Sequence, residues 1–233
     1  MIPIGDDRRL PIVPFVVYLL IAANVYVFTL EARAPDIDRF ISLFATIPYD
    51  ITHGIVLAPP SPAIPLLTIV TAMFMHASIL HIGFNMLFLF VFGPVIEYIC
   101  GHLRFALLYL ACGIAGGIAQ VASAPGSHVP ELGASGAIAG ILGAYIVTYP
   151  TARINTIVPI GCFPLFLRLP ALIVIGLWAV TQFISGFGLL SDRVSDAADS
   201  TAYFAHIGGF ALGVIAIGLF RRRGWGTRGS RSY

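Results

Sequence analysis

The sequence predicts an all-α polytopic membrane protein, folded as a bundle of six transmembrane helices. Of its 233 residues, 58% are hydrophobic and only 10% are charged, and the mean hydropathy is +0.92. Because soluble domains carry about 25% charged residues, this composition excludes an ordinary soluble protein. Apolar stretches that reach or approach the length of a membrane span cover residues 12–30, 79–99, 104–123, 135–150, 170–190 and 202–220.

The first stretch, residues 12–30, is long enough to span and lacks the small-residue cleavage site of a signal peptide. The segment that follows, residues 31–78, is rich in proline toward its end and contains short amphipathic pieces. We expect this segment to lie on the outer membrane surface. We also expect a single membrane domain over residues 1–223 and a disordered, basic, cytoplasmic tail over residues 224–233.

The fourth stretch, residues 135–150, is short for a span. Its length at 1.5 Å per residue is ~24 Å, whereas the hydrocarbon core of a bilayer is ~30 Å thick. The loop before it must therefore dip below one membrane surface, where non-helical backbone survives only inside protein or beside water. We expect Ser135, at the start of this stretch, to lie in a pocket that admits water.

The arginines predict the orientation of the chain. Six spans place both termini on one side of the membrane. With the termini inside, ten of the thirteen basic residues lie in inner segments and three, Arg33, Arg39 and Arg193, lie in outer ones. The positive-inside rule then predicts cytoplasmic N- and C-termini for a multi-pass protein of the cell's inner (plasma) membrane.

Two polar residues inside the apolar stretches are the candidate catalytic residues. Ser135 stands at the start of the fourth stretch, in GASGAIAG, and His206 stands about four residues into the sixth, in AHIGGFALG. Both lie toward the outer side, so their depths are similar. Polar residues inside a membrane are costly and mark function by default. We interpret Ser135 as a nucleophile and His206 as its base, with backbone N–H groups at the helix start facing a developing oxyanion.

Glycines are predicted to bring these two helices together. Gly209 and Gly213 lie three and seven residues after His206, on the same helical face. Small residues let membrane helices approach closely, although a serine in such a stripe is often only structural. The predicted packing positions are Gly133, Gly136, Gly140, Gly209 and Gly213.

A third polar group opens the second span, in the sequence HASILHIGFN. His81 and Asn85 are four residues apart and share one helical face. Both side chains donate hydrogen bonds, which suits an oxyanion hole, whereas an interfacial polar belt is the alternative reading. We expect no metal site, because no third ligand is near them and the three cysteines show no ligand spacing.

Glu97 is the only acidic residue in any predicted span. It follows His81 by a helical distance of ~24 Å, which places it near the inner surface. We expect it to have a structural role near Arg104, so the catalytic unit is predicted to be a Ser–His dyad.

These motifs together resemble the rhomboid family of intramembrane serine proteases. FMHASILHIGFN, FGPVIEYICGHLRF, ELGASGAIAG and AHIGGFALG occur in the family order across residues 65–215. The resemblance implies a six-helix bundle that cleaves transmembrane helices of other proteins near their outer ends, within the lipid bilayer and without a cofactor or nucleic acid. It also implies that Ser135 is the nucleophile and His206 the base. Asn85, His81 and the Ser135 amide would then form the oxyanion hole.

The sequence departs from the family pattern in two places. Some members carry an aromatic residue one turn after the serine, stacked on the base, where this chain has Ala139. Tyr203 and Phe204 are the residues we consider for holding His206 instead. Well-known bacterial members also carry a Trp-Arg pair in the first outer loop, whereas the tryptophans here are Trp178 and Trp225.

Two other functions stay open. The first is a catalytically inactive relative that binds membrane clients, although such relatives usually lack the serine or the histidine. The second is a small-molecule transporter, although transporters often show inverted repeats, and we find none in the sequence. The sequence does not indicate an oligomeric state.

Overall fold

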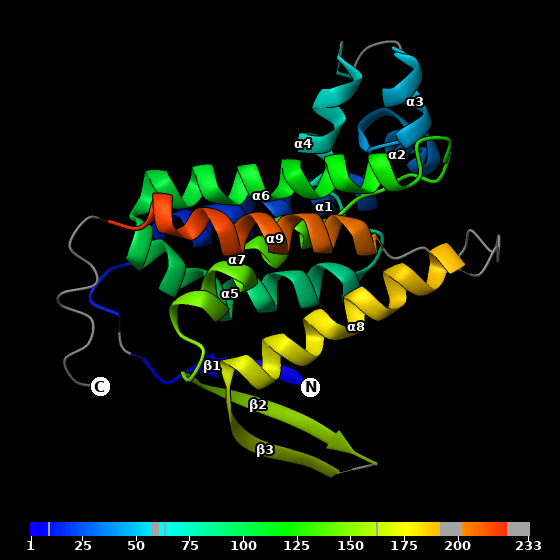
Figure 1. The fold of residues 1–233 in the computed structure, drawn as a ribbon. Helices are drawn as coiled ribbons and strands as arrows, with labels where there is room; N and C mark the ends of the chain where they lie inside the picture. The colour runs from blue at the N-terminus through cyan, green and yellow to red at the C-terminus, as the bar shows by residue number, and fades with distance from the viewer. Residues whose placement is uncertain (9, 57–60, 63, 162, 192–201, 223–233) are drawn as a thin grey trace.

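The computed structural model describes residues 1–222 except 9, 57–60, 63, 162 and 192–201 (Figure 1). The predicted basic tail lies outside the described residues. The helices are α1 (Phe15–Arg33), α2 (Ile37–Phe44), α3 (Pro48–His53), α4 (Thr68–Ala72), α5 (Ile79–Cys100), α6 (His102–Ser123), α7 (Ser135–Thr148), α8 (Ala171–Ser191) and α9 (Tyr203–Phe220), with a 3-10 turn, η1 (Pro65–Leu67), before α4. The strands are β1 (Ile2–Asp6), β2 (Arg153–Ile160) and β3 (Phe163–Pro170).

The predicted helical membrane bundle is confirmed. Among the described residues, α1, α5, α6 and α9 are long and apolar enough to cross a membrane, and α7 and the first part of α8 are shorter apolar helices. Each of the six apolar stretches of the sequence therefore corresponds to a helix. We call the end of the bundle where α7 and α9 begin the outer end, and the opposite end the inner end. The short helices α2, α3 and α4 gather at the outer end (Figure 1).

Helix α7 is the centre of the bundle. Its residues from Gly136 to Tyr145 are all buried, and it packs against α5, α6, α8 and α9. The closest packing is between α7 and α9, because a methyl group at Gly209 or Gly213 would overlap a backbone carbonyl oxygen of α7. These two helices therefore touch through their backbones, as small residues allow in membrane proteins.

Helix α8 is anchored to the bundle at its first turn. Its first residue, Ala171, donates a backbone hydrogen bond to the carbonyl of Ala152 (2.8 Å), and Ala171, Val174 and Ile175 are buried. Farther along the helix, Val180 and Ile184 are more than half exposed. In Figure 1, α8 runs at an angle to α6 and α9 rather than along them.

A small antiparallel sheet, which the sequence analysis did not predict, lies beside the helices in the order β1-β2-β3. β2 and β3 form a hairpin between α7 and α8, paired from Arg153 and Pro170 at its base to Ile160 and Phe163 at its tip. The turn includes Gly161, whose φ of 57° is a left-handed conformation that favours glycine. The N-terminal strand β1 pairs with β2 and packs against α5.

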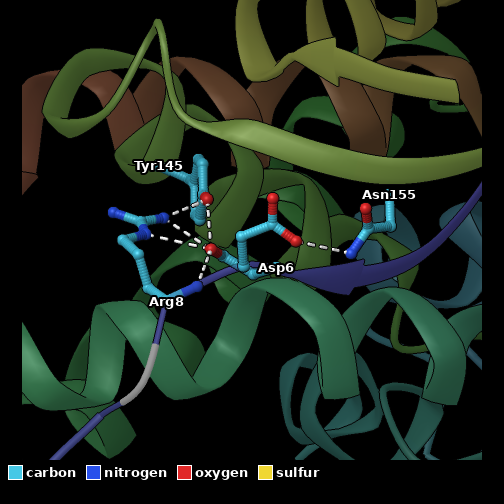
Figure 2. Close-up of polar contacts among 5 residues, drawn as sticks. Asp6, Arg8, Tyr145 and Asn155 are labelled. Carbon is cyan, nitrogen blue, oxygen red and sulfur yellow. Dashed lines mark hydrogen bonds and ion pairs between the residues drawn. The ribbon is translucent and has the colours of Figure 1, made fainter. Parts of the chain in front are cut away.

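Polar contacts tie the sheet to the bundle (Figure 2). The hydroxyl of Tyr145, on α7, donates to the carboxylate of Asp6 and accepts a hydrogen bond from Arg8. Nε of Arg8 also donates to Asp6 (3.0 Å), and Asn155 of β2 donates to Asp7 (2.7 Å). The N-terminal segment is therefore held against the inner half of α7, and β2 is held against that segment.

Glu97 lies at the inner end, as predicted, but its hydrogen bonds join it to groups other than Arg104, the residue expected near it. Its carboxylate accepts the backbone N–H groups of Val16 and Val17, both at 2.9 Å, and a hydrogen bond from His102. Arg104 donates instead to the carbonyl of Arg221 (3.3 Å). Glu97 therefore satisfies the free N–H groups at the start of α1, a site where a helix favours negative charge.

Candidate active site

Ser135 and His206 meet at the outer end of the bundle. Ser135 is the first residue of α7, and His206 lies in the first turn of α9. Oγ of Ser135 is 2.8 Å from Nε2 of His206, which is hydrogen-bonding distance. The imidazole is buried. The backbone contact between α7 and α9 holds the two side chains together.

The other ring nitrogen of His206 is bonded to α8. Its Nδ1 is 2.7 Å from Oε1 of Gln182, and the Trp178 ring lies with its centroid 5.7 Å from the imidazole centroid. Nε2 of Gln182 donates in turn to Thr181 (3.2 Å), which orients the amide. The sequence analysis considered Tyr203 and Phe204 for holding His206 and missed this partner. The only sequence signal is one amide side chain within an otherwise apolar span.

His81 and Asn85 lie on α5, and His81 is close to the serine. Ser78 caps this helix by accepting the N–H of His81 (3.1 Å), which fixes where the helix begins. A side chain at Gly133 would approach His81 Nε2 to 2.9 Å and Ser135 Oγ to 3.6 Å, so the imidazole and the hydroxyl border the same small space. Gly133 has a φ of 132°, which only glycine adopts readily, so it keeps this space open.

Two residues close to His81 carry buried polar atoms: Asn85, one helical turn along α5, and His76, whose ring centroid lies 5.0 Å from that of His81. Nδ2 of Asn85 is buried without a partner among the described residues, and so are both ring nitrogens of His76. No side chain of the described residues caps the start of α7, where Ser135 lies. A buried donor without a partner costs about 1–3 kcal/mol, so its presence needs a reason such as a bound reaction intermediate.

Glu31 is a second site residue that the sequence analysis missed. It is buried near the outer end of α1, and its carboxylate accepts the backbone N–H of His76 at 3.1 and 3.2 Å. The predicted first span stopped at residue 30, so Glu31 was assigned to a loop. It fixes the segment that leads into α5 and therefore positions His81 and Asn85.

A small cavity of about 40 Å³ opens behind Ser135; its lining is mainly apolar, with polar groups from Thr46, Gln120 and Glu131. Gln120 donates to Glu131 (3.0 Å) and accepts the N–H of Ala205 (3.2 Å), so it joins the loop before α7 to the start of α9. Burial raises the pKa of Glu131 to about 7, against the opposing effect of the Gln120 hydrogen bond. A cavity of this volume has room for a water, which Gln120 and Glu131 can hydrogen-bond.

Among the described residues, no three His, Cys, Asp or Glu side chains lie close enough together to hold a metal ion.

The predicted packing glycines have distinct positions. Gly136 of α7 faces the backbone of α9, and Gly140 lies against Cys112 of α6 and the Gly209 carbonyl of α9. Gly209 and Gly213 face α7, whereas Gly133 lies in the loop beside His81.

The family model of the rhomboid domain matches residues 65–223. Rhomboid protease GluP of Bacillus subtilis is 35% identical over 159 residues, which are 66% of this chain and 28% of that protein. Rhomboid protein 1, mitochondrial, of Saccharomyces cerevisiae is 29% identical over 206 residues, 85% of this chain and 51% of that protein. The human Presenilin-associated rhomboid-like protein, mitochondrial, is 31% identical over 140 residues, 59% of this chain and 34% of that protein.

The chain thus spans about half or less of the length of these relatives. The family match covers more than half of the chain itself and includes all four motifs that carry the resemblance. The chain is therefore a multi-pass membrane protein that belongs to the rhomboid family.

Proposed function

We propose that this protein is a serine endopeptidase that cleaves transmembrane segments of other membrane proteins through a dyad of Ser135 and His206. The observation that carries the proposal is the 2.8 Å contact between Ser135 Oγ and His206 Nε2 at the outer end of the bundle. A serine beside a histidine, with the histidine oriented by a third group, is the arrangement that activates a hydroxyl for nucleophilic attack.

The geometry supports a simple proton path. When Nε2 of His206 accepts the Ser135 proton, Nδ1 carries a hydrogen and donates it to Oε1 of Gln182. Oγ attacks the peptide carbonyl carbon, and the proton moves to Nε2. His206 then returns this proton to the leaving amine, which leaves an acyl group on Ser135.

The attack places a negative charge on the carbonyl oxygen. Nδ2 of Asn85, the ring of His81 and the backbone N–H groups at the start of α7 are the donors available to hold it. Such donors act most strongly when they are already in position and shielded from bulk water. Asn85 Nδ2 has no hydrogen-bond partner within the part of the chain that the structure describes, which fits this role.

Water is needed to release the acyl group. The cavity behind Ser135 is mainly apolar, but Gln120 and Glu131 line it together with the serine and offer polar partners for a water. A water there gives a proton to His206 as it attacks the ester carbon. His206 then passes this proton to Oγ as the bond between the acyl carbon and Oγ breaks, which releases the new carboxyl terminus and returns Ser135 and His206 to their starting states.

We further propose a single membrane domain over residues 1–223 in the inner (plasma) membrane of the cell, with both termini in the cytoplasm. The support is the ten-to-three distribution of arginines between the two sides. The substrates would be transmembrane proteins whose helices reach the outer end of the bundle, where Ser135 lies.

The test is labelling of the purified protein with a serine-directed fluorophosphonate, together with cleavage of single-span proteins in vesicles. The wild type should label and cleave, whereas Ser135→Ala and His206→Ala should do neither while remaining folded in detergent, because the two residues act as one unit. Ser42→Ala, at a hydroxyl bonded within its own helix, is the control and should behave as the wild type.

Two results would contradict the proposal. Cleavage by purified Ser135→Ala protein would show another nucleophile. A folded wild-type protein that neither labels nor cleaves would favour the inactive client-binding relative or the transporter.

A further inference from the structure

The β2–β3 hairpin divides into a polar base and an apolar tip. Arg153, Asn155 and Arg168 lie at the base, where Arg168 is 3.8 Å from the carboxylate of Asp7. From residue 156 to residue 167, the sequence contains no charged side chain. All charge on the hairpin is therefore at the end that joins the bundle.

The tip is apolar and uncovered on both faces. Phe163 is 80% exposed and Phe166 is 66% exposed, and Leu165, between them and next to Phe166, is 44% exposed. Because neighbouring residues of a strand point to opposite faces, both faces of β3 present bare apolar side chains. A sheet covered by its own protein on one side would show alternating burial instead. In Figure 1 the tip stands clear of the helices.

The apolar surface continues onto the lipid-facing side of α8. β3 ends at Pro170 and α8 begins at Ala171, and Leu172, Ile173 and Leu177 of α8 are each at least half exposed. A side chain exposed on a membrane-spanning helix faces lipid. The hairpin therefore extends a surface that already contacts the acyl chains.

A protein strand is a poor fit for the same surface. Pro159 and Pro164 face each other close to the tip. Proline has no N–H group to donate, and it blocks strand addition at a sheet edge. A partner that needs no backbone hydrogen bonds, such as a lipid layer, has no such difficulty.

We propose that the tip of the β2–β3 hairpin inserts into the inner leaflet of the membrane as a lipid anchor beside α8. From Arg168 to Phe163 the strand rises by ~17 Å at about 3.4 Å per residue. The headgroup layer on one side of a bilayer is only ~5–8 Å thick. The tip can therefore reach the acyl chains while Arg153 and Arg168 stay among the phosphates. The proposal holds whether or not the chain is a protease.

Spin labels can test this placement in vesicles of phosphatidylethanolamine and phosphatidylglycerol. The labelled positions are Phe163→Cys and Phe166→Cys, each in a Cys162→Ser background, since Cys100 and Cys112 are buried and will not react. Thr151→Cys, exposed in the turn between α7 and β2, is the water reference. Leu177→Cys on α8 is the lipid reference.

The measurement is collision of each label with oxygen, which concentrates in lipid, and with a nickel chelate, which stays in water. Both tip labels should resemble Leu177→Cys, with an oxygen-to-nickel ratio several-fold above that of Thr151→Cys. Tip labels that match Thr151→Cys would place the hairpin in water and overturn the proposal. Tip labels that neither reagent reaches would show a protein partner and overturn it as well.

Discussion

Gln182 and His206 form a hydrogen bond that crosses from α8 to α9, with 2.7 Å between Oε1 and Nδ1. The proposed base is thus oriented by a helix other than its own. α8 packs less closely on α9 than α7 does, and its residues Val180 and Ile184 are more than half exposed. The geometry of the dyad therefore depends on where α8 lies.

The first prediction concerns this bond. Gln182→Leu should lower kcat by roughly 10- to 100-fold with little change in KM, because a misplaced base costs rate rather than binding. Gln182→Glu keeps an acceptor oxygen at the same reach, so it should retain activity within a few-fold. Steady-state cleavage of a single-span substrate in vesicles measures both.

Val180→Ala, at an exposed position on the same helix, is the control and should leave kcat unchanged. If Gln182→Leu turned over at the wild-type rate, the amide would not be a positioning residue.

The second prediction concerns the oxyanion donors. Asn85→Ala should lower kcat by roughly 10- to 1000-fold, more than it raises KM, since the donor binds a charge that exists only during reaction. His81→Ala should act in the same direction. Asn24→Ala is a matched control, because Asn24 is also a buried asparagine in a span but donates to the Leu20 carbonyl (2.7 Å) of its own helix. Equal kcat for Asn85→Ala and Asn24→Ala would remove Asn85 from the site.

The third prediction concerns the contact between α7 and α9. Gly209→Ala should slow fluorophosphonate labelling by on the order of 100-fold, because the new methyl group would overlap the Gly136 carbonyl and separate Ser135 from His206. Gly218→Ala, on the same helix, meets no atom within 4 Å and should label normally. Similar labelling of the two variants would mean that the close approach is not needed for reactivity.

The fourth prediction is a pH dependence of stability. Burial raises the pKa of Glu131 from 4.5 to about 7, so the folded protein binds its proton more tightly than the unfolded chain. Stability from this carboxyl is therefore present below pH 4.5 and is lost as the pH rises toward 7. Partial exposure screens the charge, so we expect a loss on the order of 2 kcal/mol, at ~1.4 kcal/mol per pKa unit.

Glu131→Gln cannot ionise and should remove this loss. Unfolding in detergent at pH 5 and pH 8 measures the effect in both proteins. The wild type should lose more stability than the variant over this range, and equal losses would contradict a buried, protonated Glu131.

The helical part of the fold could be predicted from the sequence because a membrane span needs a long apolar run, which is a local property. The predicted second span, 79–99, and the observed α5, Ile79–Cys100, differ by one residue. Ser135 was correctly expected at the start of its helix, because the stretch before it is rich in proline and glycine.

The parts that the sequence analysis missed depend on tertiary contacts. The hairpin was hidden because residues 151–170 separate two spans and read as a short inner loop, although Ile154, Ile157 and Val158 are β-branched and Gly161 marks a turn. The sequence does not indicate which neighbouring helix Gln182 faces. Glu31 was assigned to a loop because the predicted first span ended too early. Hydropathy locates the end of a span only to within a few residues.

Because α8 is anchored at its inner end, a tilt of this helix would displace its outer residues most. Its first residue is bonded to Ala152, and Ala171, Val174 and Ile175 are buried, so an outward tilt of the helix would pivot near Ala171. Gln182 lies eleven residues farther along, ~16 Å at 1.5 Å per residue, so a tilt of roughly 10° carries it about 3 Å. That displacement exceeds the range of a hydrogen bond. A tilt of that size would therefore leave the proposed base, His206, without the hydrogen bond that orients it.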